Sequence, residues 1–172
     1  TQDRASKINF GGLDDSDDAE KDVLDRLDAE LTFVMSSYGG DELHATSSAV
    51  VRFLNLDMDQ ETTVRVNLTL TIPEGYPASG TLDVKAEIDD ASTSGSTEAR
   101  KFVSDYLLFL VNVCQWEANV SLGDEAMLTV LTTADQWVQN DWAGIRTKHL
   151  GEKHSQKGEG ARTFEICRLL VY

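Results

Sequence analysis

The sequence predicts an α+β domain in which helices pack on one side of an antiparallel β-meander. Apolar and polar residues alternate over residues 64–72, which is typical of a strand with one buried face. Apolar residues recur every three or four positions over residues 23–38, 99–114 and 127–138, which is typical of amphipathic helices. The chain has 172 residues, enough for one domain with its own core.

The first expected element is a helix that begins at Ser16 or Asp17 and ends before Gly39-Gly40. Either of the two first residues can cap the helix, acidic residues suit its first turn, and glycine is common at a helix end. Its predicted apolar stripe consists of Val23, Leu24, Leu27, Leu31, Val34, Met35 and Tyr38. Residues 1–18 form an acidic, polar N-terminal segment that we expect to be disordered up to its last few residues.

Three strands are expected next. The first lies within residues 43–56, and a hairpin loop at 57–61 leads into the second strand at 64–72. A third strand at 82–88 follows after a tight turn. Three strands that follow one another with short connections predict an antiparallel meander.

The turn between the second and third strands carries a Tyr-Pro pair. Pro73 cannot donate a hydrogen bond to the sheet and Gly75 permits unusual backbone angles, so the strand ends there. Tyr76 brings an apolar ring with a hydroxyl that needs a partner, and Pro77 restricts the next backbone angle. We expect the Tyr76 ring to pack against the end of the sheet, with its hydroxyl bonded to nearby backbone.

Two helices are expected after a polar loop at residues 89–97, the first over 99–114 and the last over 124–142. Residues 143–161 are rich in Gly, Lys and His and predict a basic linker. Residues 162–172 are apolar again and predict a strand. Because a solitary strand is not stable alone, this segment either pairs with an edge of the sheet or begins a second domain.

The order helix, antiparallel meander, Tyr-Pro turn and two helices resembles the RWD domain, a relative of ubiquitin-conjugating enzymes that lacks their activity. The signature of that family is Tyr-Pro with a second Pro shortly after it; Tyr76 and Pro77 match, whereas Thr81 stands at the second Pro position. The RWD-like part is residues 19–142, and it is most similar to the RWD-domain-containing protein 2 group. The resemblance implies a ubiquitin-conjugating-enzyme-like fold and a non-catalytic adaptor that binds another protein.

Composition limits the partners and the compartment. The formal net charge of −15 argues against binding of nucleic acid by the RWD-like domain and against anionic membrane surfaces. No apolar run is long enough to span a bilayer. Cys114 and Cys167 lie far apart in apolar surroundings, which argues against a disulfide and favours the cytoplasm or nucleus.

No catalytic residue, cofactor or metal site is predicted. Transfer through a cysteine thiolate needs an exposed thiol, whereas Cys114 falls on the apolar stripe of a helix and Cys167 lies outside the RWD-like domain. His44, His149 and His154 lack the spacing of metal ligands. We therefore expect a protein that is not an enzyme.

The candidate partner-binding residues are Trp142 and its neighbour Asp141, at the end of the last helix. Tryptophan is favoured at the centres of protein interfaces, and Trp137 is assigned to the core instead. Two alternatives to an adaptor stay open: a component of the ubiquitin or SUMO pathway that binds a conjugating enzyme, and an RNA-associated protein that uses its basic C-terminal region. The partner and the oligomeric state do not follow from the sequence.

Overall fold

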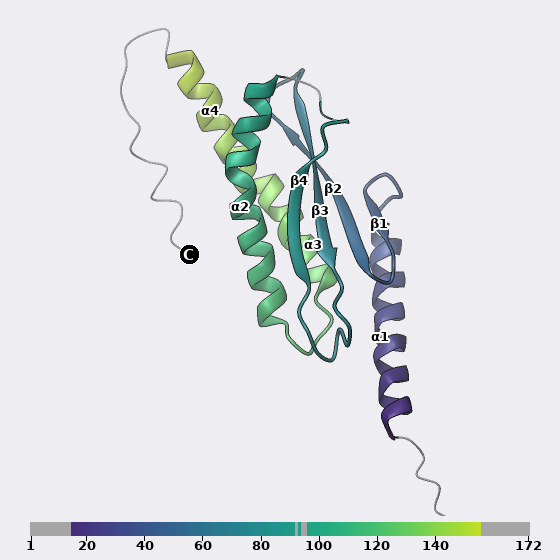
Figure 1. Ribbon diagram of the computed structural model, residues 1–172. Helices are drawn as coiled ribbons and strands as arrows, with labels where there is room; N and C mark the ends of the chain where they lie inside the picture. The colour runs from purple at the N-terminus through teal and green to yellow at the C-terminus, as the bar shows by residue number, and fades with distance from the viewer. Residues whose placement is uncertain (1–14, 92, 94–95, 156–172) are drawn as a thin grey trace, which may run out of the picture.

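The computed structural model describes residues 15–91, 93 and 96–155, and it confirms the predicted α+β class (Figure 1). The elements in chain order are α1 (Asp15–Ser37), β1 (Leu43–Ala45), β2 (Ala49–Asp57), β3 (Thr63–Thr71), β4 (Asp83–Ile88), α2 (Thr97–Val120), α3 (Met127–Gln136), the π-helical segment η1 (Trp137–Trp142) and α4 (Ala143–Ser155). The four strands form one antiparallel sheet in the order β1-β2-β3-β4.

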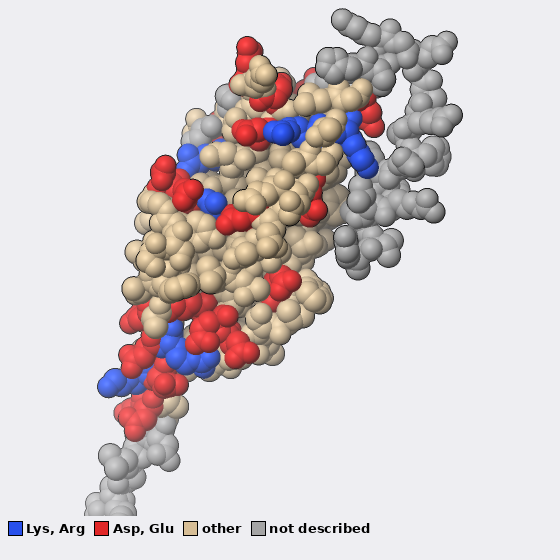
Figure 2. Space-filling model, turned by 180° about the vertical axis from the view of Figure 1, so that it is seen from behind, with Lys and Arg blue, Asp and Glu red and all other residues tan. Residues whose placement is uncertain are grey.

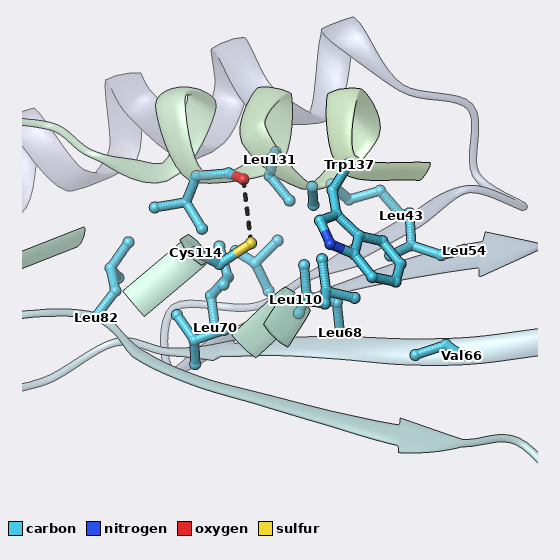
Figure 3. Close-up of a cluster of buried hydrophobic side chains, with 14 of the residues drawn as sticks. Leu43, Leu54, Val66, Leu68, Leu70, Leu82, Leu110, Cys114, Leu131 and Trp137 are labelled. Carbon is cyan, nitrogen blue, oxygen red and sulfur yellow. Dashed lines mark hydrogen bonds between the residues drawn. The ribbon is translucent and has the colours of Figure 1, made fainter. Parts of the chain in front are cut away.

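The predicted second strand is β3, and its alternating apolar residues form the inner face of the sheet. In β3, Val64, Val66, Leu68 and Leu70 are buried, and the residues between them are partly exposed. Side chains from α2, α3 and η1 cover this inner face, as Figure 3 shows for Cys114, Leu131 and Trp137. The helical layer and the sheet thus share one core, as the sequence predicts.

The first predicted strand, expected within residues 43–56 and most strongly at Ala49 to Leu54, corresponds to β2, but the expectation of a single strand in this stretch is wrong because β1 precedes it. β1 and β2 form a hairpin in which His44 lies opposite Val51. The hydroxyl of Thr46 accepts hydrogen bonds from the backbone N–H groups of Ser48 and Ala49, at 3.3 and 3.2 Å. These bonds stabilise a reversal of the chain that hydrophobic alternation does not reveal.

Helix α1 lies beside β1 at the edge of the sheet and buries only a narrow face (Figure 1). Leu27, Leu31 and Val34 are buried as predicted, whereas Leu24 and Met35 are about half exposed, at 53% and 54%. The predicted stripe is therefore too wide. A helix at the margin of a sheet contacts neighbours on fewer sides than a helix laid across its face.

The prediction that the last helix ends at Trp142 and that a linker follows is wrong for residues 143–155, which form α4. The chain passes without a break from α3 through η1 into α4, despite Gly144 and Gly151. The ring of Phe102 in α2 stacks on that of His149 in α4 at 4.0 Å between centroids, which ties this extension to the domain. The predicted terminal strand at 162–172 and most of the acidic segment at 1–18 lie outside the described residues.

Candidate protein-interaction surface and its supporting anchor

Tyr76 anchors the turn between β3 and β4 to two helices. Its side chain is 3% exposed, and its hydroxyl donates to Glu30 Oε1 at 2.9 Å and accepts from the backbone N–H of Ala126 at 2.7 Å. Gly75 reaches φ +84° in the same turn, a backbone angle that favours glycine. The expected burial of Tyr76 and a bond to backbone are confirmed, and the carboxylate of Glu30 is an additional partner.

Glu30 of α1 stabilises the first turn of α3. Ala126 stands at the N-cap position of α3 and makes no side-chain capping bond. Glu30 Oε1 instead accepts a hydrogen bond from the backbone N–H of Met127 at 2.7 Å. A carboxylate at a helix N-terminus satisfies a free donor and interacts favourably with the helix dipole, so α1 and α3 are coupled through one buried side chain.

Further polar contacts hold α1 on both sides of Glu30 along the chain. Arg26 Nε donates to Glu125 Oε1 at 2.7 Å, before α3 begins. The Tyr38 hydroxyl donates to Asp135 Oδ2 at 2.8 Å, and Arg52 of β2 donates to Oδ1 of the same aspartate at 3.0 Å. The long acidic helix is thus positioned by specific pairs as well as by its narrow apolar face.

Burial raises the pKa of Glu30, because the charged carboxylate is removed from water. Hydrogen bonds from Met127 and Tyr76 and the charge of Arg26 oppose this rise, and the charge of Glu125 adds to it. Among the described residues, none donates a hydrogen bond to Glu30 Oε2, which is buried. The folded state therefore holds a proton on Glu30 more tightly than an exposed glutamate does.

This raised pKa predicts a pH dependence of folding. At pH values between the ordinary carboxyl pKa of about 4.3 and the higher folded-state pKa, the folded state binds more protons at Glu30 than the unfolded state. The Glu30 contribution to stability is then fully present below this window and decreases as the pH rises through it. Urea unfolding of Glu30→Gln across this range is expected to show a smaller decrease with pH than the parent.

The control for this experiment is Glu20→Gln, the same chemical change at an exposed position of α1. It is expected to keep the pH slope of the parent protein. Identical slopes for the parent and Glu30→Gln would show that Glu30 does not titrate differently in the folded and unfolded states.

Cys114 lies where its helical phase predicts, fully buried between α2 and α3 (Figure 3). Its Sγ is 3.9 Å from the carbonyl oxygen of Val130. Burial, followed by the charges of Glu117 and Asp135, raises the pKa of this thiol to about 12. Both effects disfavour the thiolate, which is the nucleophilic form. Cys167 lies outside the described residues.

We expect Cys114 to react with a thiol reagent only when the protein unfolds. In a Cys167→Ser variant, which leaves one thiol, native labelling should proceed at the rate of global or sub-global opening. Labelling in denaturant is the positive control. Complete native labelling as fast as that of a free thiol would contradict the burial of Cys114.

The described part of the chain holds no metal-binding cluster, and the recess beside the Tyr76 turn is lined by few polar side chains. No group of three or more His, Cys, Asp or Glu side chains there could hold a metal ion. An open recess of about 380 Å³ lies between α1 and the Tyr76 turn, lined by Ala19, Glu20, Val23, Leu24, Glu74 and Gly75. Apart from the two glutamates, the lining residues are apolar or glycine.

The candidate binding site at Trp142 is wrong with respect to that tryptophan. Trp142 is 2% exposed, stacks on Trp137 at 6.1 Å between ring centroids, and donates from Nε1 to the carbonyl oxygen of Asp57 at 3.1 Å. Asp141, the other candidate, is exposed. Without an exposed Trp142, these two residues do not form the predicted anchor.

The exposed tryptophan is Trp116 of α2, at 62%. It lies with Phe109, Val113 and Val120 on one side of the helix, and we call these four residues the outer stripe. At 100° per residue they fall within about 60° of the helix circumference. Val120 is 57% exposed, and Phe109 and Val113 are exposed to a smaller extent.

The opposite side of α2 explains why the outer stripe is held in place. Val103, Leu107, Leu110, Cys114 and Ala118 are buried on the inner side. In Figure 1, α2 lies on the near side of the molecule, and no described helix or strand is drawn in front of its C-terminal half. The sequence signal for Trp116 is its position two residues after Cys114, off the periodicity of the buried side.

Comparisons of the sequence with protein-family models and with curated proteins, and of the structure with solved structures, found no significant match. None of the described helices is long and apolar enough to cross a membrane.

Proposed function

We propose that the chain contains a non-catalytic protein-interaction domain of the RWD type, which acts as an adaptor. The observation that carries this proposal is the outer stripe, an apolar surface centred on a tryptophan that is 62% exposed. Contiguous exposed apolar surface is uncommon on folded proteins without a partner, and tryptophan is enriched among the residues that dominate binding energy.

The rigidity of α2 supports the same proposal. The helix buries six side chains in the core and is capped at its N-terminus by Ser96, whose side chain accepts a hydrogen bond from the N–H of Ala99 at 3.3 Å. A surface that is already ordered before binding loses little conformational entropy when a partner docks. The outer stripe is therefore suited to binding a partner without rearrangement.

The order of elements and the Tyr76-Pro77 turn support the RWD type. One helix precedes an antiparallel meander, the Tyr-Pro turn follows β3, and α2 and the continuous run of α3, η1 and α4 follow β4. The buried thiol of Cys114, with its pKa raised to about 12, argues against the related thioester chemistry at that residue.

Capture of binding partners with the tagged full chain tests the proposal. A protein recovered with the parent chain should bind it again when both are purified. A parallel assay with a ubiquitin-activating enzyme and a SUMO-activating enzyme should yield no thioester on the chain. Thioester formation, or failure to reconstitute binding of any recovered protein, would contradict an adaptor.

A further inference from the structure

The outer stripe has the spacing of a helix–helix contact. Its residues stand at positions i, i+4, i+7 and i+11 from Phe109 to Val120, which is the periodicity of the seam between packed helices. The stripe is about 16 Å long at 1.5 Å per residue, or about three turns of a facing helix. A partner helix with an apolar residue every three or four positions would match it along its length.

The stretch of chain that carries the outer stripe has charged residues of one sign. Residues 102–145, which include most of α2, all of α3 and all of η1, contain no Lys, Arg or His. The acidic residues in this range are Asp105, Glu117, Asp124, Glu125, Asp135 and Asp141. Of these, Glu125 pairs with Arg26 and Asp135 pairs with Arg52, both from elements outside the range.

Two of the remaining acids border the outer stripe directly. Asp105 precedes Phe109 by one turn, and Glu117 follows Val113 by one turn. Within the described residues, neither forms an ion pair. Positive side chains at the edges of an apolar partner would face these carboxylates, whereas negative ones would be repelled.

The same charge argues against a second copy of this chain as the occupant. Two outer stripes facing each other would bring the acids of both copies together, and the whole chain carries a formal charge of −15. On the face turned away from α2, acidic side chains gather along α1 with a few basic ones among them (Figure 2). A partner of opposite charge therefore fits the stripe better than a second copy of this chain.

We propose that the outer stripe of α2 binds an amphipathic helix of another protein, whose apolar side chains are flanked by Lys and Arg. This inference rests on the proposed function and names the surface and the partner class. Trp116 packs at the centre of the contact, and Asp105 and Glu117 pair with basic residues at its rim. The apolar residues supply most of the affinity, and the rim charges select the sign of the partner.

Three fluorescent peptides of about 18 residues, five helical turns, test this proposal against the full chain. The first carries Leu on one face and Lys on the other, the second replaces every Lys by Glu, and the third has the first composition in an order without an apolar face. Binding is measured by fluorescence anisotropy at about 0.15 M salt, where charges beyond about 8 Å are largely screened. The dissociation constant of the first peptide should be lower than that of either other peptide by a factor of about ten or more.

Variants of the full chain locate the binding. Trp116→Ala and Val120→Ala should each weaken binding of the Leu/Lys peptide, the former about tenfold or more. Phe33→Ala is the matched control, since Phe33 is also more than half exposed but lies on α1. Glu117→Lys should weaken binding and reduce its salt dependence, whereas Asp28→Lys on α1 makes the same charge change and should alter binding less than twofold. Melting temperatures of all variants should match the parent.

Several outcomes would overturn the inference. Equal affinity for the Leu/Lys and Leu/Glu peptides would show that the charge of the partner does not matter. Equal affinity for the Leu/Lys peptide and its reordered form would show that an amphipathic helix is not what binds. Undiminished binding to Trp116→Ala would place the contact elsewhere. A dimer in sedimentation that Trp116→Ala dissociates would make a second copy the occupant, and preferential competition by a peptide of residues 162–172 would make the chain's own segment the occupant.

The experiments distinguish a failure of the adaptor function from a failure of the outer stripe as the binding site. If a reconstituted partner binds the parent and Trp116→Ala equally, the outer stripe is not its site, and the adaptor function stands. If the Leu/Lys peptide binds at the stripe but no protein partner can be reconstituted, the surface is correctly identified and the adaptor function fails.

Discussion

Replacing Tyr76 with alanine is expected to lower the free energy of unfolding by about 3–5 kcal/mol, the range for removing a large buried aromatic side chain. The ring is almost fully buried, so its loss leaves a cavity in the core. Its hydroxyl bonds both Glu30 and the N–H of Ala126, and these buried polar groups would lose a partner. Urea unfolding monitored by circular dichroism measures the effect.

Two further variants separate the contributions of the ring and the hydroxyl. Tyr76→Phe keeps the ring and removes both hydrogen bonds, so it should cost about 1–3 kcal/mol. Phe33→Ala removes an aromatic ring that is 56% exposed and should leave stability nearly unchanged. If Tyr76→Ala unfolded at the same urea concentration as the parent, the Tyr76 anchor would not stabilise the fold.

The sequence predicts that Tyr76 is buried but identifies only part of its environment. A tyrosine in a turn after a strand needs an apolar site and a hydrogen-bond partner, and both requirements follow from local chemistry. Its partners Glu30 and Ala126 are 46 and 50 residues away in the chain. Only the packing of α1 and α3 brings them together, and no local pattern encodes that.

The burial of Glu30, the partner of Tyr76, is also only partly predictable from the sequence. Glu30 lies in a segment, Asp14 to Glu30, that contains nine acidic residues. In such a segment a glutamate is ordinarily expected to be exposed to solvent. Glu30 follows Leu27 by three residues and precedes Val34 by four, so it shares their helical face. Periodicity can therefore indicate a polar residue on the buried face, but it cannot supply the Tyr76 hydroxyl and the Met127 N–H that bond it there.

The burial of Trp142 could not be predicted because the last helix changes its period. In a regular α-helix, residues five apart point about 140° away from each other, so the burial of Trp137 does not predict the burial of Trp142. The π-helical segment η1 has bonds that span five residues, and this brings the two tryptophans onto the same side, where they stack. Trp116 lies in the regular helix α2, where the ordinary period would have identified it as exposed.

The α4 helix was missed because its composition favours a loop. Gly144 and Gly151 each disfavour a helix by about 1 kcal/mol relative to alanine. Contacts to the domain outweigh this preference, including the stacking of His149 on Phe102 and the partly buried Ile145 beside the core. Local propensity is a weak predictor where a helix continues from one that is already packed.

Trp142→Ala is expected to destabilise the protein by about 3–5 kcal/mol, whereas Trp116→Ala should change stability by less than about 0.5 kcal/mol. Trp142 is 2% exposed and contacts the rings of Phe102, Tyr106 and Trp137, which belong to two different helical segments. Its removal leaves a cavity among these rings and frees the Asp57 carbonyl from the indole N–H. The two variants make the same chemical change, so the comparison isolates burial, and thermal and urea unfolding of both measure it. Equal stabilities would mean that Trp142 is not a core residue, and a partner-binding role for it would again have to be tested.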